Sequence, residues 1–122
     1  MESKDLIRLK HMIDSAQAVL EFARGRRRAD LDRDRLLLSG ILRELEVMGE
    51  AANKISEKTK KEFSHLPWKE LVGMRNRLIH AYFDIDHDVI WKTIREYLPS
   101  FTKEVEKVLL KLNSRESSST KH

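Results

Sequence analysis

Residues 36–55 read LLLSGILRELEVMGEAANKI, and the spacing of their apolar residues indicates the fold class. The apolar residues recur at steps of three and four, which places one stripe along an α-helix: Leu38, Ile41, Leu45, Met48, Ala52 and Ile55. We expect this helix to run from about Leu31 to about Lys60, capped by Asp30 or Asp32. It would then be roughly 45 Å long and the longest helix of the fold.

A polar row lies beside that stripe at positions i, i+4 and i+7, formed by Glu46, Glu50 and Asn53. Two interpretations stay open for this row. It is either the solvated face of an amphipathic helix or the lining of a cleft.

Four more helices are predicted from stripes of the same spacing and from their end signals. The first covers residues 6–23 and ends at Gly25. The third begins at Pro67, which suits a first turn because it has no amide hydrogen to satisfy. The fourth stops before Pro99, and Ser100 caps a fifth helix, whose apolar positions are Phe101, Val105, Val108 and Leu112.

The composition agrees with an all-α protein of one domain. The 122 residues include only four Gly and two Pro, too few for the turns of a sandwich or the loops of a doubly wound fold. The absence of cysteine excludes thiol catalysis, cysteine-bound metals and disulfides. No apolar run has the length of a transmembrane helix and no signal peptide is recognisable, so we expect a cytoplasmic protein without a membrane partner.

The distribution of charge leaves several options open. A net charge of +4 is compatible with a nucleic-acid partner but does not demonstrate one. An arginine-rich loop either is solvated or contacts RNA or an acidic partner, and its basic residues are Arg24, Arg26, Arg27, Arg28, Arg33 and Arg35. From residue 113 the sequence is polar and patternless, which predicts a helical domain over 1–112 and a disordered tail over 113–122.

Two further groups of side chains favour structural roles. The aspartates of the sequence DIDHD suit the N-terminus of a helix better than a metal site, namely Asp84, Asp86 and Asp88. Trp68 and Trp91 stand at helical spacing beside apolar residues, which favours the core over base stacking.

Residues 74–82, MRNRLIHAY, concentrate groups that can act on a phosphodiester. Cleaving RNA without a metal requires a base for the 2′-hydroxyl, an acid for the leaving oxygen and a fixed cation for the phosphate. His80 can serve as base or acid, and Arg75 can bind phosphate bidentately. Asn76 shares a helix face with His80, four residues away, where it could orient the imidazole.

The spacing by itself does not establish a nuclease. Arg75 and His80 lie about 140° apart around a regular helix. They converge only if the Arg75 side chain wraps round, if the helix distorts, or if a second copy of the chain supplies the partner. Gly73, on the face of Asn76, suits the close approach of a second helix. Alternatively, the cations and the His simply complement the negative end of the helix dipole.

The run GMRNRLIHAYFDID resembles the HepT-like proteins of the HEPN superfamily (higher eukaryote and prokaryote nucleotide-binding domains). The stretches LRELEVMGEAANKIS and LPWKELVGMRNRLIH resemble it too, and the likeness extends from about Asp5 to about Leu112. Members of this family are all-α bundles that pair as homodimers with their motif helices facing across a cleft. The resemblance implies an antiparallel, HEPN-like bundle of about five helices in a homodimer.

The same resemblance implies a function. HepT proteins are toxins of prokaryotic type II toxin–antitoxin pairs and act as metal-independent endoribonucleases. Their motif of Arg, four residues, His, one residue and Tyr is matched by Arg75, His80 and Tyr82. Arg75 and His80 are thereby implied as the catalytic pair, without metal or cofactor, and we expect Asn76 and Arg77 to support them. An MntA-like nucleotidyltransferase antitoxin is implied to silence the toxin by transferring AMP to Tyr82.

Two hypotheses of different classes follow. The first is an RNA-cleaving toxin that works as a dimer. The second is a non-catalytic HEPN subunit that binds within a nucleotidyltransferase complex. The complete set of Arg75, Asn76 and His80 favours the first, because a pure binding module does not need the His.

Overall fold

The computed structural model describes residues 3–80 and 85–120, with side chains for 4–78 and 85–115. No strand occurs in these two ranges, and the predicted all-α fold is confirmed. The elements follow in the order α1 (Ser3–Ala23), α2 (Asp30–Arg33), α3 (Arg35–Lys54), α4 (Glu57–Glu62), α5 (Trp68–His80), α6 (His87–Lys92), the π-helical turn η2 (Thr93–Tyr97) and α7 (Leu98–Thr120).

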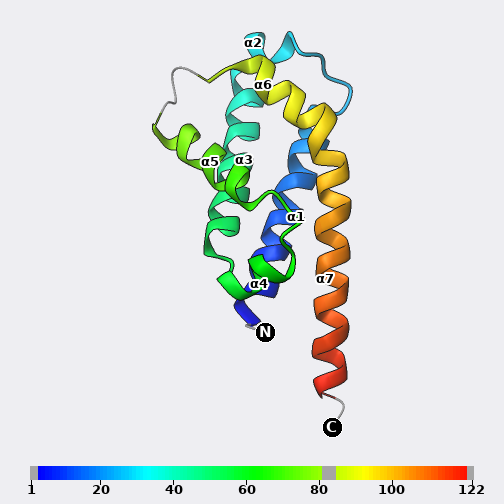
Figure 1. Cartoon of the computed structure of the whole chain (residues 1–122). Coiled ribbons are helices and arrows are strands. Elements are labelled where there is room, and N and C mark those ends of the chain that lie inside the picture. Colours follow the sequence, from blue (N-terminus) through cyan, green and yellow to red (C-terminus); the bar gives the residue numbers. More distant parts are fainter. Residues whose placement is uncertain (1–2, 81–84, 121–122) are drawn as a thin grey trace.

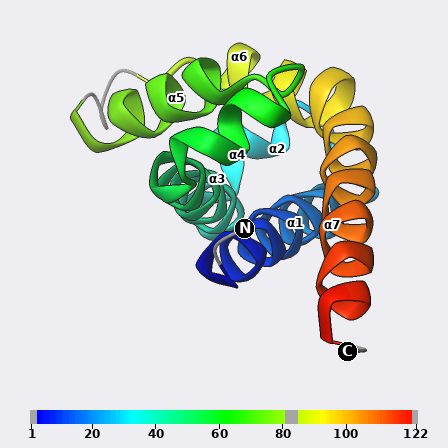
Figure 2. The same cartoon turned by 60° about the horizontal axis from the view of Figure 1, so that its bottom comes forward.

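Helix α1 is the central element of the bundle. It packs against α3 on one side and against α7 on the other, and α5 packs in turn against α3 (Figures 1 and 2). Helices α3 and α7 both run in the direction opposite to α1 (Figure 1). The helix that carries the Arg75 motif is therefore attached to the bundle mainly through α3.

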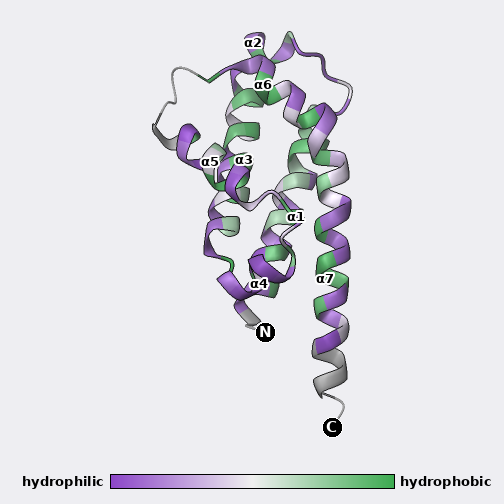
Figure 3. Ribbon diagram, in the orientation of Figure 1, coloured by the Kyte–Doolittle hydropathy of each residue, from purple (hydrophilic) through white to green (hydrophobic). Residues whose placement is uncertain are grey.

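The predicted apolar stripes form the core. Ile41, Leu45 and Ala52 of the stripe in α3 have no exposed surface, and the stripe of α7 is buried at Val105 and Leu112. Hydrophobic and hydrophilic residues alternate along α1, α3 and α7, as expected for helices with one buried face (Figure 3). Apolar burial of this kind is the main stabilising term of the fold.

The prediction of one unbroken helix over residues 31–60 is wrong at both ends. Asp34 leaves the helical conformation, with φ −107° and ψ 94°, and its side chain accepts a hydrogen bond from the amide of Leu37. It caps α3 in place of the two earlier aspartates. Ser56 likewise caps α4 by accepting from the amide of Thr59. Each capping side chain offers the backbone an alternative to continuing the helix, so α2, α3 and α4 are separate.

The expected stop before Pro99 is also absent. The chain passes from α6 through η2 into α7, and the amide of Leu98 donates to the carbonyl of Thr93, an i to i+5 bond. The wider π turn accommodates Pro99, which has no amide hydrogen and whose ring crowds the preceding turn. Ser100 does not cap a new helix, since its hydroxyl donates to the Tyr97 carbonyl from within α7.

The other helix ends are as follows. Gly25 has φ +71°, a left-handed conformation that ends the first helix as predicted. The backbone of α7 is helical as far as Thr120, where the sequence predicted a disordered tail from residue 113.

A buried carboxylate joins α1 to α4. Asp5 is 1% exposed and accepts hydrogen bonds from the Ser56 amide at 3.1 Å, the Ser56 hydroxyl at 2.6 Å and the Thr59 hydroxyl at 2.7 Å. Burial raises the pKa of the Asp5 carboxyl, but these hydrogen bonds outweigh it and leave the pKa lowered. Arg8 adds a second tie by donating to the Lys54 carbonyl at the end of α3, at 2.7 Å.

None of the helices in the described ranges is both long enough and apolar enough to cross a lipid bilayer.

Candidate functional site

The candidate site begins with a close contact between α3 and α5. A Cβ atom placed on Gly49 would lie 2.4 Å from the Arg75 Cβ and 2.8 Å from the Leu71 carbonyl oxygen. Real Cβ atoms do not come so close to neighbouring backbone, so only glycine fits at this position of α3. The missing side chain lets α5 press against α3 at Arg75 itself.

Glu50, the next residue on α3, binds the Arg75 guanidinium. The Arg75 Nε donates to Glu50 Oε2 at 3.0 Å, and Nη2 donates to Glu50 Oε1 at 3.2 Å. The third nitrogen, Nη1, donates to the Asn76 side-chain oxygen at 2.8 Å. Both members of the ion pair are partly buried, with 24% of the Arg75 side chain and 36% of the Glu50 side chain exposed. A bidentate pair of this kind fixes the plane of the guanidinium.

This arrangement leaves Arg75 able to bind an anion. A guanidinium carries five N–H donors, and three of them are used by Glu50 and Asn76. Two donors on Nη1 and Nη2 remain for a phosphate oxygen. The sequence predicts that Asn76 orients the His80 imidazole, whereas the contact described in the structure is with Arg75. The His80 side chain is outside the described ones, so the predicted role of Asn76 stays a prediction.

The remaining residues of the motif lie elsewhere or outside the description. His80 is the last residue of α5, and its side chain is outside the described ones. Tyr82 lies outside the described residues. Arg77 is exposed and lines a cavity of about 590 Å³ between α5 and the region of α6, η2 and the start of α7. Arg77 is thus not beside Arg75.

Within the chain, the glycine at which another helix approaches closely is Gly49 and not Gly73, and the approach of a second copy of the chain at Gly73 stays a prediction. A Cβ on Gly73 would meet nothing within 4 Å, whereas Gly49 is the residue in close contact. For the polar row of α3, the cleft interpretation is confirmed at Glu46 and Glu50, which line a groove of about 450 Å³ between α1 and α3. Asn53 is exposed and is not part of that lining.

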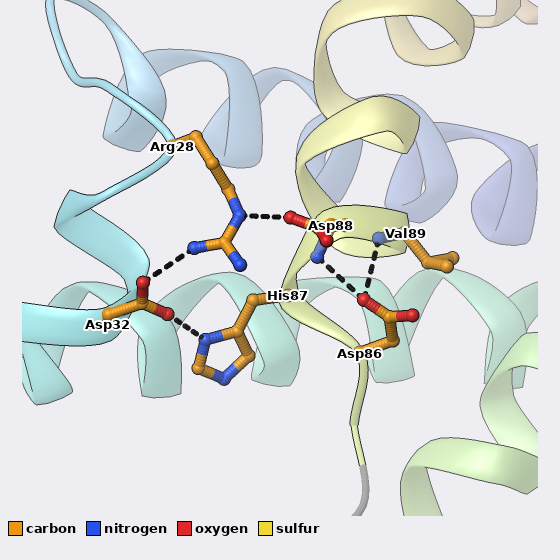
Figure 4. Close-up of polar contacts among 6 residues, drawn as sticks. All are labelled: Arg28, Asp32, Asp86, His87, Asp88 and Val89. Carbon is orange, nitrogen blue, oxygen red and sulfur yellow. Dashed lines mark hydrogen bonds and ion pairs between the residues drawn. The ribbon is translucent and has the colours of Figure 1, made fainter.

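A second polar cluster joins the arginine-rich loop to α6 (Figure 4). Arg28 donates to Asp32 at 2.7 Å and to Asp88 at 2.5 Å, and the His87 ring nitrogen Nδ1 lies 2.6 Å from Asp32. The bonds to His87 and then Arg28 lower the pKa of Asp32. The bonds to Asp88 and Asp32 raise the pKa of Arg28. The partner of His87 is not predictable from the sequence, because Asp32 stands 55 residues earlier.

The capping interpretation of the acidic sequence is confirmed at Asp86, which accepts hydrogen bonds from the amides of Asp88 and Val89 (Figure 4). Asp84 lies outside the described residues. Among the described residues, no group of three or more His, Asp or Glu side chains is arranged to hold a metal ion.

The two tryptophans differ. Trp68 is buried, with 8% exposed, and its indole donates to the Phe63 carbonyl at 3.0 Å, so its predicted core role is confirmed. Trp91 is only partly buried and packs against the core. The Arg95 guanidinium lies over its ring, 5.8 Å from the centroid.

Comparison with known proteins gives concordant matches. A family model described as "Ribonuclease HepT-like" matches residues 12–108. The protein named "Putative RNase MJ1380" of Methanocaldococcus jannaschii is 38% identical over 98 residues, 80% of this chain and 90% of that protein. "Probable ribonuclease HepT" of Thermococcus cleftensis is 35% identical over 100 residues, 82% and 91% of the two chains. "Putative RNase TTE0752" of Caldanaerobacter subterraneus is 34% identical over 103 residues, 84% and 92%. No solved structure matches significantly.

Proposed function

Because this chain belongs to the ribonuclease HepT-like family, we propose that it is an endoribonuclease that cleaves RNA through Arg75 and His80 of α5. The observation that carries the proposal concerns the Arg75 guanidinium. Glu50 and Asn76 hold it in place, and two of its N–H donors remain available for a phosphate oxygen. The three similar proteins carry RNase or ribonuclease in their names, which supports the same activity.

The proposed chemistry needs no metal ion. His80 accepts the proton of the RNA 2′-hydroxyl, whose oxygen then attacks the adjacent phosphorus. The bond from phosphorus to the 5′-oxygen breaks, which yields a 2′,3′-cyclic phosphate and a 5′-hydroxyl end. Arg75 binds the phosphoryl oxygens as their negative charge grows.

A homodimer would supply the missing acid. One imidazole cannot take a proton from the 2′-oxygen and give one to the 5′-oxygen in the same instant, so the second His80 comes from a partner copy. Sedimentation of the purified protein tests this step, with a dimer as the expected species. A monomer that cleaves RNA at full rate would contradict it.

Cleavage in the presence of EDTA tests the whole proposal. We expect a labelled single-stranded RNA to be cut in EDTA and to carry cyclic phosphate ends. Arg75→Ala and His80→Ala should each reduce kcat by at least about a hundredfold, as for the loss of one group that stabilises transition-state charge or transfers a proton. The matched control Arg95→Ala, on the surface of η2, should cleave like the unmodified protein.

Two outcomes would contradict this proposal. Loss of cleavage in EDTA and its return with a divalent ion would overturn metal independence. Equal behaviour of the unmodified protein and of both α5 variants would favour the alternative, a non-catalytic binding subunit of a nucleotidyltransferase complex.

We further propose that the protein is the toxin of a type II toxin–antitoxin pair in the prokaryotic cytoplasm, silenced by AMP transfer to Tyr82. A phosphate-bearing group two residues from His80 would compete for the cations that bind RNA. Intact mass after incubation with an MntA-like partner and ATP should show AMP adducts. These should vanish in Tyr82→Phe and persist in Tyr97→Phe, since Tyr97 is 57% exposed and is the other tyrosine of the chain. An adduct on Tyr97 would contradict the assignment.

A further inference from the structure

The groove between α1 and α3 carries an uneven set of charges. These two helices lie side by side (Figures 1 and 2), and the groove between them has a volume of about 450 Å³. Its α1 wall presents Lys4, Arg8 and His11, and its α3 wall presents Arg43 and Lys54 among the lining residues. Four of these side chains are lysine or arginine, whereas the lining holds two carboxylates, Glu46 and Glu50.

Both carboxylates of the groove are already engaged. Glu46 pairs with Arg43 at 3.7 Å, and Glu50 pairs with Arg75 at 3.0 Å. Within the described ranges, Lys4, Arg8 and Lys54 form no ion pair, and the Arg8 contact is to a neutral carbonyl. The groove therefore offers positive charge to a ligand without first having to break an internal ion pair at those three residues.

The cations are spaced along the groove. Lys4, Arg8 and His11 stand at i, i+4 and i+7 and thus on one face of α1. Arg43 and Lys54 are eleven residues apart on α3, which is about 16 Å along a helix. That length corresponds to about four or five nucleotides of a stacked strand, whose phosphates lie roughly 3.4 Å apart along the axis.

Glu50 connects the groove to the candidate site. It lines the groove from α3 and at the same time holds the Arg75 guanidinium from α5. A strand of nucleic acid lying between α1 and α3 would therefore pass Glu50, the residue that binds the Arg75 guanidinium. An acidic protein segment would also meet the positive charges, but it would not account for their position next to a phosphate-binding arginine.

We propose that the groove between α1 and α3 binds the sugar–phosphate backbone of the RNA substrate next to the bond that Arg75 and His80 cleave. Lys4 and Lys54 at one end of the groove and Arg43 at the other neutralise phosphates that lie about four or five nucleotides apart, independently of the bases. This inference rests on the proposed ribonuclease function and adds to it the path of the strand.

Binding of an uncleavable RNA tests the inference separately from catalysis. The probe is a fluorescent single-stranded 2′-O-methyl oligonucleotide, which keeps the phosphates and lacks the attacking hydroxyl. The groove variant combines Lys4→Gln, Arg43→Gln and Lys54→Gln, all at exposed positions. Arg8 is left intact because it holds the end of α3. The control variant loses three positive charges elsewhere, at exposed Lys58, Lys92 and Lys103.

We expect the groove variant to bind the probe at least about tenfold more weakly at low salt, and the control variant to bind almost normally. The slope of log Kd against log salt concentration should fall by about 2, because each neutralised phosphate of a single strand contributes about 0.7 to it. Equally weakened binding in both variants, or an unchanged slope, would overturn the inference. So would normal RNA binding by the groove variant together with abolished binding of a purified nucleotidyltransferase partner, since the groove would then be a protein surface.

The failure of the ribonuclease proposal has a different signature. If the groove variant no longer binds RNA while the unmodified protein binds RNA but cleaves none, the groove binds RNA and the catalytic assignment is wrong.

Discussion

Two regions of the molecule hold an arginine between polar partners, and they do so in different ways. At the contact of α3 with α5, Arg75 is pressed against Gly49 and gripped by Glu50, with a quarter of its side chain exposed. At the corner of α2 and α6, Arg28 extends from a loop to Asp32 and Asp88, whose side chains are 52% and 78% exposed (Figure 4). The ion pair of Arg75 lies at a close contact between two helices, whereas the carboxylates that bind Arg28 are exposed to water.

The two regions indicate what makes an arginine ready to bind a phosphate. A guanidinium whose backbone and side chain are both fixed loses little freedom when it binds a phosphate. Arg28 meets its partners only where water and salt compete for them. The difference predicts large effects from changes at Gly49, intermediate effects at buried or half-buried carboxylates, and small effects at the α2–α6 corner.

The largest effect is expected from Gly49→Ala. The added methyl group would lie 2.4 Å from the Arg75 Cβ, so α5 must move away from α3, at a cost of about 3 kcal/mol of unfolding free energy. The matched variant is Gly73→Ala, whose methyl group meets nothing within 4 Å. It should raise the unfolding free energy by about 1 kcal/mol, the difference in helix propensity.

Urea unfolding of both glycine variants provides the measurement. Similar values for the two would mean that the close contact of α3 with α5 does not exist in solution.

The second effect concerns Asp5, a carboxylate that is buried outright. Asp5→Asn should lower the unfolding free energy at pH 7 by about 2 kcal/mol, because an amide cannot accept all three bonds that Ser56 and Thr59 donate. The lowered pKa of Asp5 determines how its contribution to the unfolding free energy changes with pH. Its contribution is present above the unfolded pKa of about 3.9 and is lost as pH falls through the folded value.

Unfolding of the unmodified protein and of Asp5→Asn should therefore converge on acidification below about pH 4. A difference that stays constant down to pH 2 or grows there would contradict the assigned shift.

The same elements show which features of the fold could be predicted from the sequence. The stripe of α3 identified the core because apolar period alone decides which side chains turn inward. It did not reveal the breaks at Asp34 and Ser56, because both residues lie outside the stripe from Leu38 to Ile55, where the spacing of apolar residues gives no information on where the helix ends.

The site was predictable only in part, for a physical reason. The composition of residues 74–82 identified the motif. The partner of Arg75, however, is Glu50, which stands 25 residues earlier and is brought to it only by the folded bundle. A signal was present in the Gly49-Glu50 pair within an otherwise regular helical stripe, since a glycine inside a helix indicates close packing. Asp32 and His87 carried no comparable signal.

The third effect is on catalysis, through Glu50. Glu50→Gln keeps the shape of the side chain but removes the charge that fixes Arg75, so kcat should fall on the order of tenfold to a hundredfold while KM changes little. Stability should change by about 1 kcal/mol or less, because the ion pair is partly exposed.

Cleavage kinetics of Glu50→Gln beside the control Glu44→Gln, also on α3, provide the test. A loss of stability without a change in kcat would assign Glu50 a purely structural role.

The smallest effect is expected from Arg28→Gln at the α2–α6 corner. The variant loses the bonds to Asp32 and Asp88, yet both carboxylates are exposed and water replaces the guanidinium as their partner. Thermal unfolding should shift downward slightly at low salt, and the shift should vanish at about 1 M salt, where exposed ion pairs are screened. Cleavage should be unchanged. A fall in kcat as large as that of Glu50→Gln would show that the α2–α6 corner helps to shape the site. The difference in packing between Arg28 and Arg75 would then not decide which of the two arginines affects catalysis.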